Sequence, residues 1–175
     1  MEELERLLEE GRHVEFVVEF VEQLNELDDK IRKAREKGDR NMEEKFKSEK
    51  RKVMQWCENY VKNKEIPQQE RKLIDLSCVL GVYLAKKRGA LKTTQIRKML
   101  DRFNSIESDR DNFDKSALIK LKTILAYTAA RNKPTGELVR ILDNSIGKAG
   151  SIDDFKKICE FLRGVVAYHK LAGGE

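Results

Sequence analysis

The segment SIDDFKKICEFLRGVVAYHK, residues 151–170, has the pattern of one amphipathic helix. Ser151 precedes it as a helix N-cap residue, whose hydroxyl can accept a hydrogen bond from a free backbone N–H of the first turn. The apolar side chains follow the i, i+3, i+4, i+7 spacing of one helical face and are Phe155, Ile158, Cys159, Leu162, Val165 and Val166. The same period recurs along the chain, which contains only 2 Pro. The sequence therefore predicts an all-α fold.

Seven helices are predicted, at about residues 2–37, 41–63, 67–88, 94–106, 115–132, 135–146 and 151–170. Pro67 suits the start of the third, and Thr93 or Thr94 the N-cap of the fourth. Asp114 is the predicted N-cap of the fifth. We expect a helical bundle of about six or seven helices, with residues 1–65 as a long N-terminal helical hairpin and residues 66–175 as the bundle proper.

The predicted hairpin joins an acidic helix to a basic one through a turn at Gly38 and Asp39. Residues 2–37 are expected to form one continuous helix, because their apolar side chains recur about every 3.5 residues. Those side chains are Leu4, Leu7, Val14, Val17, Val21, Leu24 and Ile31. The second helix carries Phe46, Val53, Trp56, Cys57 and Tyr60 on one face. The opposite charges of the two helices favour an antiparallel pair.

Composition argues against an enzyme or a metal protein. The chain has 2 His at widely separated positions, His13 and His169, which leaves little basis for a nucleophile activated by histidine or for a histidine metal site. No phosphate-binding glycine loop is present, so we expect no catalytic residue, metal or cofactor. The cysteines Cys57, Cys78 and Cys159 sit in apolar surroundings and indicate buried thiols in a reducing compartment.

The N-terminus lacks the basic region of a signal peptide, and the longest nearly apolar run, residues 77–85, is too short to cross a bilayer. These features predict a soluble, cytoplasmic protein without a membrane partner.

Charge is unevenly distributed along the chain. Residues 1–29 hold 2 basic and 11 acidic side chains, whereas residues 86–133 hold 13 basic and 5 acidic ones. Such a basic segment is typical of proteins that bind a phosphate backbone, although a solvated helix face has the same composition.

Three segments resemble the small subunit of the type III-A CRISPR Csm effector complex. They are LKTTQIRKMLDRFN from residue 91, LKTILAYTAAR from residue 121 and FKKICEFLRGVVAYHKLAGG from residue 155. Their order and spacing are similar to the family's L-x-T-[ST]-x-[IL]-R helix, its helix ending in Y-x-A-G-R, and its last helix ending in AYHK and glycines. Ala130 replaces the family's usual Gly, and Leu171 replaces a common aromatic residue. The resemblance covers about residues 73–174 and leaves residues 1–65 unassigned.

The resemblance implies a non-catalytic subunit that contacts the backbone of guide RNA and target RNA through basic helix faces and stacks with neighbouring subunits. Its partners would be these RNAs and the other Csm subunits; self-association of the isolated chain stays open. Backbone recognition needs fixed cations and no reading of base edges, because the guide supplies the sequence. The expected RNA-binding residues are Arg97, Lys98, Arg102, Lys115, Lys120, Lys122, Arg131 and Lys133.

Several of these residues have a competing structural interpretation. Arg97 could pair with Asp101 on the next helical turn, and Arg131 with Glu160 of the last helix. Lys122 has no carboxylate three or four residues away, which favours a contact with phosphate.

The aromatic and histidine residues of these segments favour structural roles. Tyr127 and Tyr168 are predicted to belong to the core, because they lie beside apolar residues at helical spacing. His169 is expected to be a charged residue near a helix C-terminus.

A different class of function also fits the sequence. The chain could be a helical adaptor or coiled-coil interaction protein without RNA binding, whose residues 1–65 bind a partner helix or another copy. The small subunit of the type III-B Cmr complex is a further relative of similar character.

Overall fold

The structure is a computed structural model that describes residues 1–87, 89, 91–108, 115–131 and 135–174, the side chains of Ser108, Lys115 and Arg131 excepted. Over this part of the chain it is all-helical, with eight helices and no strand. They are α1 (Glu2–Glu9), α2 (His13–Glu36), α3 (Arg40–Val61), α4 (Glu70–Lys86), α5 (Thr93–Ser108), α6 (Lys115–Arg131), α7 (Gly136–Lys148) and α8 (Ile152–Leu171). The predicted all-α class is therefore confirmed.

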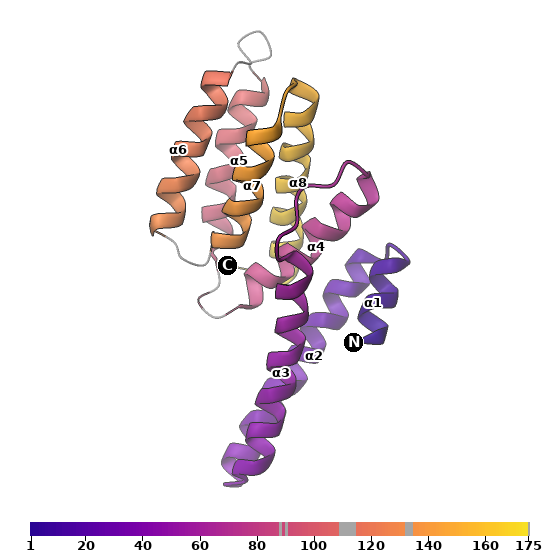
Figure 1. The fold of residues 1–175 in the computed structure, drawn as a ribbon. Coiled ribbons are helices and arrows are strands. Elements are labelled where there is room, and N and C mark those ends of the chain that lie inside the picture. Colours follow the sequence, from indigo (N-terminus) through magenta and orange to yellow (C-terminus); the bar gives the residue numbers. More distant parts are fainter. Residues whose placement is uncertain (88, 90, 109–114, 132–134, 175) are drawn as a thin grey trace.

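Figure 1 shows three parts of the molecule. Helices α5 to α8 stand side by side in the upper part, with α6 at one edge. Helix α4 crosses beneath α8, and α2 and α3 form a long two-helix arm that points away from the bundle. Helix α1 folds back beside the base of this arm. A single buried hydrophobic cluster runs from α1 to the end of α8.

The predicted helix over residues 2–37 is wrong at one point, because Gly11 divides it into α1 and α2. Gly11 has φ +78°, and its N–H donates to the Leu8 carbonyl at 3.0 Å while the Arg12 N–H donates to that of Leu7 at 2.8 Å. This pair of bonds is a Schellman C-cap, which ends α1. The buried face of α2 agrees with the prediction at Val17 and Leu24 but not at Val14, which is 59% exposed. Phe16 and Phe20 are fully buried on this face.

The turn between α2 and α3 is as predicted. Gly38 has φ +70°, and Asp39 caps α3 by accepting a hydrogen bond from the Met42 N–H at 3.0 Å. Ion pairs join the two helices across the arm, from Lys50 to Asp28 at 2.6 Å and from Arg35 to Glu43 at 2.9 Å. The acidic and basic helices therefore attract each other along the arm.

The N-terminal helices are attached to the bundle through several polar contacts. His13 Nε2 lies 2.6 Å from Asp75 Oδ1 of α4, and the His13 ring packs 6.0 Å from that of Tyr168. At the far end of α3, Lys148 of α7 contacts Glu65 at 2.6 Å. The start of α2 therefore packs on the bundle, whereas the far end of the arm points away from it (Figure 1).

Two other helix starts differ from the prediction. Helix α4 begins at Glu70, three residues after Pro67. Helix α5 begins at Thr93, which is therefore the first helical residue and not the N-cap. Its side chain is buried and makes tertiary contacts. The predicted cap at Ser151 is confirmed, because Ser151 and Asp154 form a reciprocal capping box. The predicted cap Asp114 lies outside the described residues.

Helices α4 and α8 approach each other at two glycines. A Cβ on Gly81 would lie 2.8 Å from the backbone nitrogen of His169 and 2.9 Å from the Val165 carbonyl oxygen. A Cβ on Gly164 would lie 2.8 Å from the Cβ of Ser77. Neither helix tolerates a larger residue at the crossing without moving its backbone.

His169 joins the C-terminal segment to the start of α5. The side chain is fully buried; its Nε2 donates to the Leu91 carbonyl at 2.8 Å, and its Nδ1 lies 3.0 Å from the Thr93 hydroxyl. Gly173, with φ +82°, turns the chain so that Gly174 packs against the imidazole ring. Burial lowers the pKa of His169, and the nearby Lys170 adds to the effect. His169 was expected to be a charged residue near a helix end; the structure instead places its side chain in the core, where burial disfavours the protonated form.

All three cysteines are buried, as predicted. Burial raises the pKa of Cys57 and of Cys78, and it raises that of Cys159 to about 12. The thiols are packing groups with little tendency to ionise.

The close α4–α8 crossing predicts the effect of a single methyl group. We expect Gly81→Ala to lower the free energy of unfolding by about 1–3 kcal/mol, because the new Cβ forces the helices apart. Gly136→Ala is the matched control, since no atom lies within 4 Å of its Cβ position. Urea unfolding followed by circular dichroism measures both, and equal stabilities of the two variants would contradict this account.

The buried His169, whose pKa is lowered by burial, predicts a pH dependence of stability. Because the pKa is lowered in the folded state, the unfolded chain binds the proton more tightly. The contribution of His169 is complete above about pH 6.5 and is lost as the pH falls from there towards the folded pKa, with a slope of up to about 1.4 kcal/mol per pH unit. Urea unfolding between pH 7.5 and pH 5 measures it.

One variant assigns this slope to His169. His169→Gln should be less stable than the parent at pH 7.5 and should have a flatter profile between pH 7 and pH 5. A parental slope in His169→Gln would show that other groups cause the dependence.

Candidate nucleic-acid interface

Helix α5 holds two cations of the basic segment on one exposed strip. Ile96, Met99 and Phe103 are buried and fix α5 to the core. Lys98 and Arg102 lie four residues apart and are both exposed, so their side chains follow each other along the same face. The predicted apolar stripe of this helix is thus confirmed, and it fixes the direction in which these cations point.

A groove of about 400 Å³ separates this strip from α6. The residues that line it are Gln95, Lys98, Met99, Arg102, Ile124, Tyr127 and Thr128. The groove therefore combines an apolar floor with two cations from α5 and an aromatic ring from α6.

Tyr127 is 62% exposed, so its predicted place in the core is wrong. Apolar residues surround it in the sequence, but the core side of α6 is occupied by Leu118, Leu121 and Leu125. Lys120 lies seven residues before Tyr127 and is exposed on the same side of the helix. Tyr168, by contrast, is partly buried against the core as expected.

Four of the expected RNA-binding cations have no carboxylate partner within the described part of the chain: Arg97, Lys98, Arg102 and Lys120 form no ion pair there. The alternative pairing of Arg97 with Asp101 is therefore not formed in the structure. Arg97 precedes Lys98 by one residue, which is a rotation of about 100° around the helix, and it does not belong to the lining of the groove.

Lys122 has a partner that its own helix did not reveal. Its Nζ lies 3.1 Å from Asp143 Oδ1 of α7, with both side chains partly exposed. Helical spacing relates Lys122 only to positions three and four residues away, so it does not indicate a carboxylate on a neighbouring helix. Lys122 is directed towards α7, whereas the groove lies on the side of α6 that faces α5.

The structure does not describe the side chains of three expected site residues. Lys133 lies outside the described residues, as do the side chains of Lys115 and Arg131. The proposed pairing of Arg131 with Glu160 lies outside them too.

A second basic groove, of about 770 Å³, lies where the arm meets the end of α4. Its cations are Lys47, Lys50, Arg51, Lys86 and Lys87. Sequence reasoning missed this groove because it joins residues far apart in the chain. Lys47, Lys50 and Arg51 pair with carboxylates of the arm, and Lys87 lies 4.9 Å from the ring centre of Tyr83. Most of these cations therefore already have a partner within the molecule.

Among the described residues, no three histidine, cysteine or acidic side chains form a cluster that could hold a metal ion. None of the helices in this part of the chain has the length and apolar character needed to cross a bilayer.

Comparison with protein families identifies the chain. The family model described as Csm2 Type III-A matches residues 67–175, which is more than half of the sequence. The chain belongs to this Csm2 family. It is therefore a subunit of the type III-A CRISPR Csm complex, from a family of structural subunits, and other Csm subunits are its partners. Comparisons with curated proteins and with solved structures give no match.

The Csm2 match contains all three segments on which the resemblance rested. It begins three residues before α4 and leaves α1, α2 and α3 outside. The structure explains why the first and third segments belong together. Thr93 of LKTTQIRKML and His169 of AYHK contact each other, with Gly174 packed on the imidazole. These motif residues hold the start of α5 and thereby fix the groove.

Proposed function

We propose that this Csm2 protein is a non-catalytic, cytoplasmic subunit that contacts the backbone of guide RNA and target RNA through the basic surfaces of α5 and α6. One observation carries the proposal: Lys98 and Arg102 line a groove with the exposed Tyr127, and no carboxylate among the described residues pairs with either cation. Neighbouring subunits stack beside it in the assembled complex.

The composition of the groove suits a single-stranded stretch of RNA. Cations without a partner replace the counterions of the phosphates, which gives affinity without sequence preference. An aromatic ring beside them can stack on any base, a contact worth about 1–3 kcal/mol. The Tyr127 ring and the two cations lie on opposite sides of the groove, so base and backbone can be held together.

The other expected residues extend this surface. Lys120 is exposed on the same side of α6 as Tyr127, and Arg97 lies on α5 beside the groove strip. Lys115, Arg131 and Lys133 belong to the proposal through the sequence alone. Lys122 joins it from the other side of α6, where Asp143 competes with a phosphate for its ammonium group.

The groove proposal predicts weak, salt-dependent RNA binding by the isolated chain. We expect the double variant Lys98→Ala/Arg102→Ala to reduce the slope of log K against log salt concentration by about 1.4 units, because two phosphate contacts are lost. Fluorescence anisotropy with an unstructured RNA of about 30 to 40 nucleotides, across a salt series, measures this slope.

Two further variants make the result specific. Lys45→Ala is the matched control, because Lys45 is exposed on the arm and forms no ion pair within the described residues. It should keep the parental slope. Tyr127→Ala should weaken binding about tenfold and leave the slope unchanged, since stacking releases no counterion. Absence of RNA binding in a folded parent would favour the helical adaptor instead.

Lys122 is predicted to contribute through competition with Asp143. Lys122→Ala should reduce the salt slope by about 0.7 units, because one phosphate contact is lost. Asp143→Asn should increase RNA affinity, because it leaves the ammonium group to the phosphate, while stability changes by less than about 1 kcal/mol as for other exposed pairs. The same anisotropy series measures both variants, and parental behaviour of both would remove Lys122 from the interface.

A further inference from the structure

Residues of α1, α3 and α4 line a cavity of about 360 Å³. Two aromatic rings of α3 form part of its wall: Trp56 and Tyr60 have ring centres 5.5 Å apart and planes inclined by 34°. Leu8 of α1 adds an apolar side chain. The volume falls within the range of about 300–1,000 Å³ that small-molecule sites occupy. This aromatic cavity is therefore large enough for a small ligand.

The charge of the aromatic cavity is negative. Its other lining residues are the carboxylates Glu5, Glu9 and Asp75, and no lysine or arginine of the described chain belongs to the lining. Glu5 and Glu9 lie one turn apart on α1 and therefore share a face. The aromatic rings add to this field, because their faces carry negative charge density that attracts cations. The cavity thus favours a positively charged ligand.

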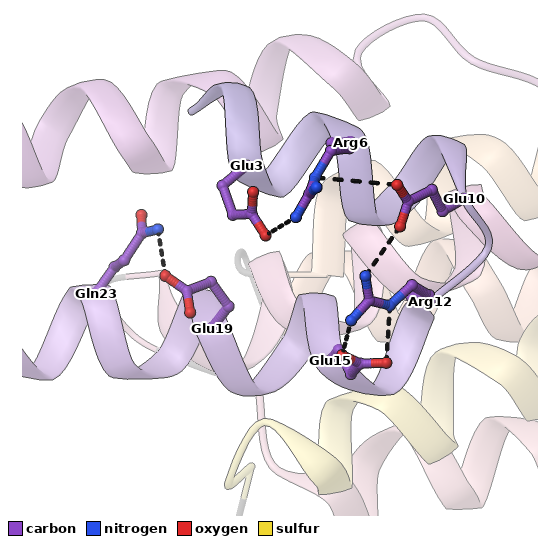
Figure 2. Close-up of polar contacts among 7 residues, drawn as sticks. All are labelled: Glu3, Arg6, Glu10, Arg12, Glu15, Glu19 and Gln23. Atoms are coloured by element: carbon purple, nitrogen blue, oxygen red, sulfur yellow. Dashed lines mark hydrogen bonds and ion pairs between the residues drawn. The ribbon is translucent and has the colours of Figure 1, made fainter.

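Two of these carboxylates have no cation as a partner. Figure 2 shows that a different face of α1 is neutralised, since Glu3 and Glu10 both contact Arg6, at 2.7 and 4.0 Å. Glu5 and Glu9, by contrast, form no ion pair among the described residues. Their charge is therefore available to a ligand in the cavity.

Hydrogen bonds hold the walls of the cavity in place. Trp56 Nε1 donates to Glu5 Oε1 at 2.8 Å, which orients both the indole ring and the carboxylate. Asp75 Oδ1 lies 2.6 Å from His13 Nε2, so this third carboxylate is held by a contact from α2. Burial, and then the Asp75 charge, raise the pKa of Tyr60 to about 12, so its phenol keeps its proton at neutral pH. A preformed site of this kind loses less entropy when its ligand binds.

The combination of rings and carboxylates selects among cations. Mg²⁺ and Ca²⁺ bind through oxygen ligands and gain little from an aromatic wall. Alkylammonium and guanidinium groups can lie over a ring and also donate hydrogen bonds to a carboxylate. Lys64 shows that Tyr60 accepts such a group, since the Lys64 Nζ lies 5.6 Å from the Tyr60 ring centre.

We propose that the aromatic cavity binds an organic cation, whose alkylammonium or guanidinium group lies against Trp56 and Tyr60 and donates hydrogen bonds to Glu5 or Glu9. Such a group belongs to a free polyamine or to a lysine or arginine side chain of a neighbouring protein. The site belongs to the N-terminal extension, because all of its lining residues except Asp75 precede the family match over residues 67–175. It shares no residue with the groove between α5 and α6.

Trp56 makes the cavity directly observable, because it is the only tryptophan of the chain. Titration of the full chain with spermidine at constant ionic strength, followed by tryptophan fluorescence, measures binding of a free polyamine. A parallel titration with N-acetylarginine amide represents a protein side chain. We expect saturable binding of at least one of the two with a Kd of about 1 mM or below, and the tighter ligand assigns the source of the cation. MgCl₂ at the same ionic strength should give no saturable change.

Two double variants of equal charge locate the ligand. Glu5→Gln/Glu9→Gln keeps an acceptor for Trp56 Nε1 but removes both charges, so it should bind at least about tenfold more weakly. Glu3→Gln/Glu10→Gln is the matched control, because it removes two charges from the same segment outside the cavity and should bind like the parent.

A further variant tests the aromatic wall. Tyr60→Leu should weaken binding about fivefold, because it removes a ring that attracts the cation. Circular dichroism verifies that each variant is folded, and ligand-observed NMR repeats each titration without relying on the fluorescence of Trp56.

Three outcomes would overturn the proposal. They are a folded parent that binds neither spermidine nor N-acetylarginine amide by fluorescence and NMR, Mg²⁺ binding as tight as that of either ligand, and parental binding by Glu5→Gln/Glu9→Gln. RNA anisotropy on this double variant separates the result from the proposed function. It should show the parental salt slope, so loss of cation binding leaves the RNA proposal intact, and failure of the RNA proposal leaves the cation site intact.

Discussion

Helices α4 and α8 cross with no room for a side chain at Gly81 and Gly164, and the remaining helices are arranged around this crossing. Ser77 fits beside Gly164, with its hydroxyl bonded to the Leu73 carbonyl at 2.7 Å. A close approach of two backbones gives many dispersion contacts and fixes the crossing angle, because any larger residue would separate the helices. The arm contacts this pair from one side and α5 from the other.

The position of the candidate interface depends on the same pair. At the end of α8 the chain turns at Gly173, and His169 bonds to Leu91 and Thr93 immediately before and at the start of α5. Helix α5 is thereby held with Ile96, Met99 and Phe103 inwards and with Lys98 and Arg102 towards the groove. A buried histidine suits this role, since both of its ring nitrogens have a partner.

The three N-terminal helices lie outside the family match but are joined to its core. Phe16 and Phe20 of α2 are fully buried, and His13 reaches Asp75 on α4. The segment therefore has a packed side and an acidic outer side.

The sequence by itself determined the fold class, the approximate helices, the turn at Gly38, the cap at Ser151 and the core stripes of α5 and α8. Each of these depends on residues within a few positions of one another, so helical periodicity and capping chemistry are enough to find them. The family resemblance came from the same local segments and agrees with the match over residues 67–175. Only the tertiary structure decided what distant residues do. The three leucines of α6 left Tyr127 outside the core. The break at Gly11 is local, since its Schellman bonds reach only Leu7 and Leu8, but the continuous apolar period of residues 2–37 concealed it. Asp143 reached Lys122 from another helix, and Thr93 met His169 across the bundle. Burial and pairing of this kind depend on which surfaces face each other after folding, and no pattern along one helix contains that information.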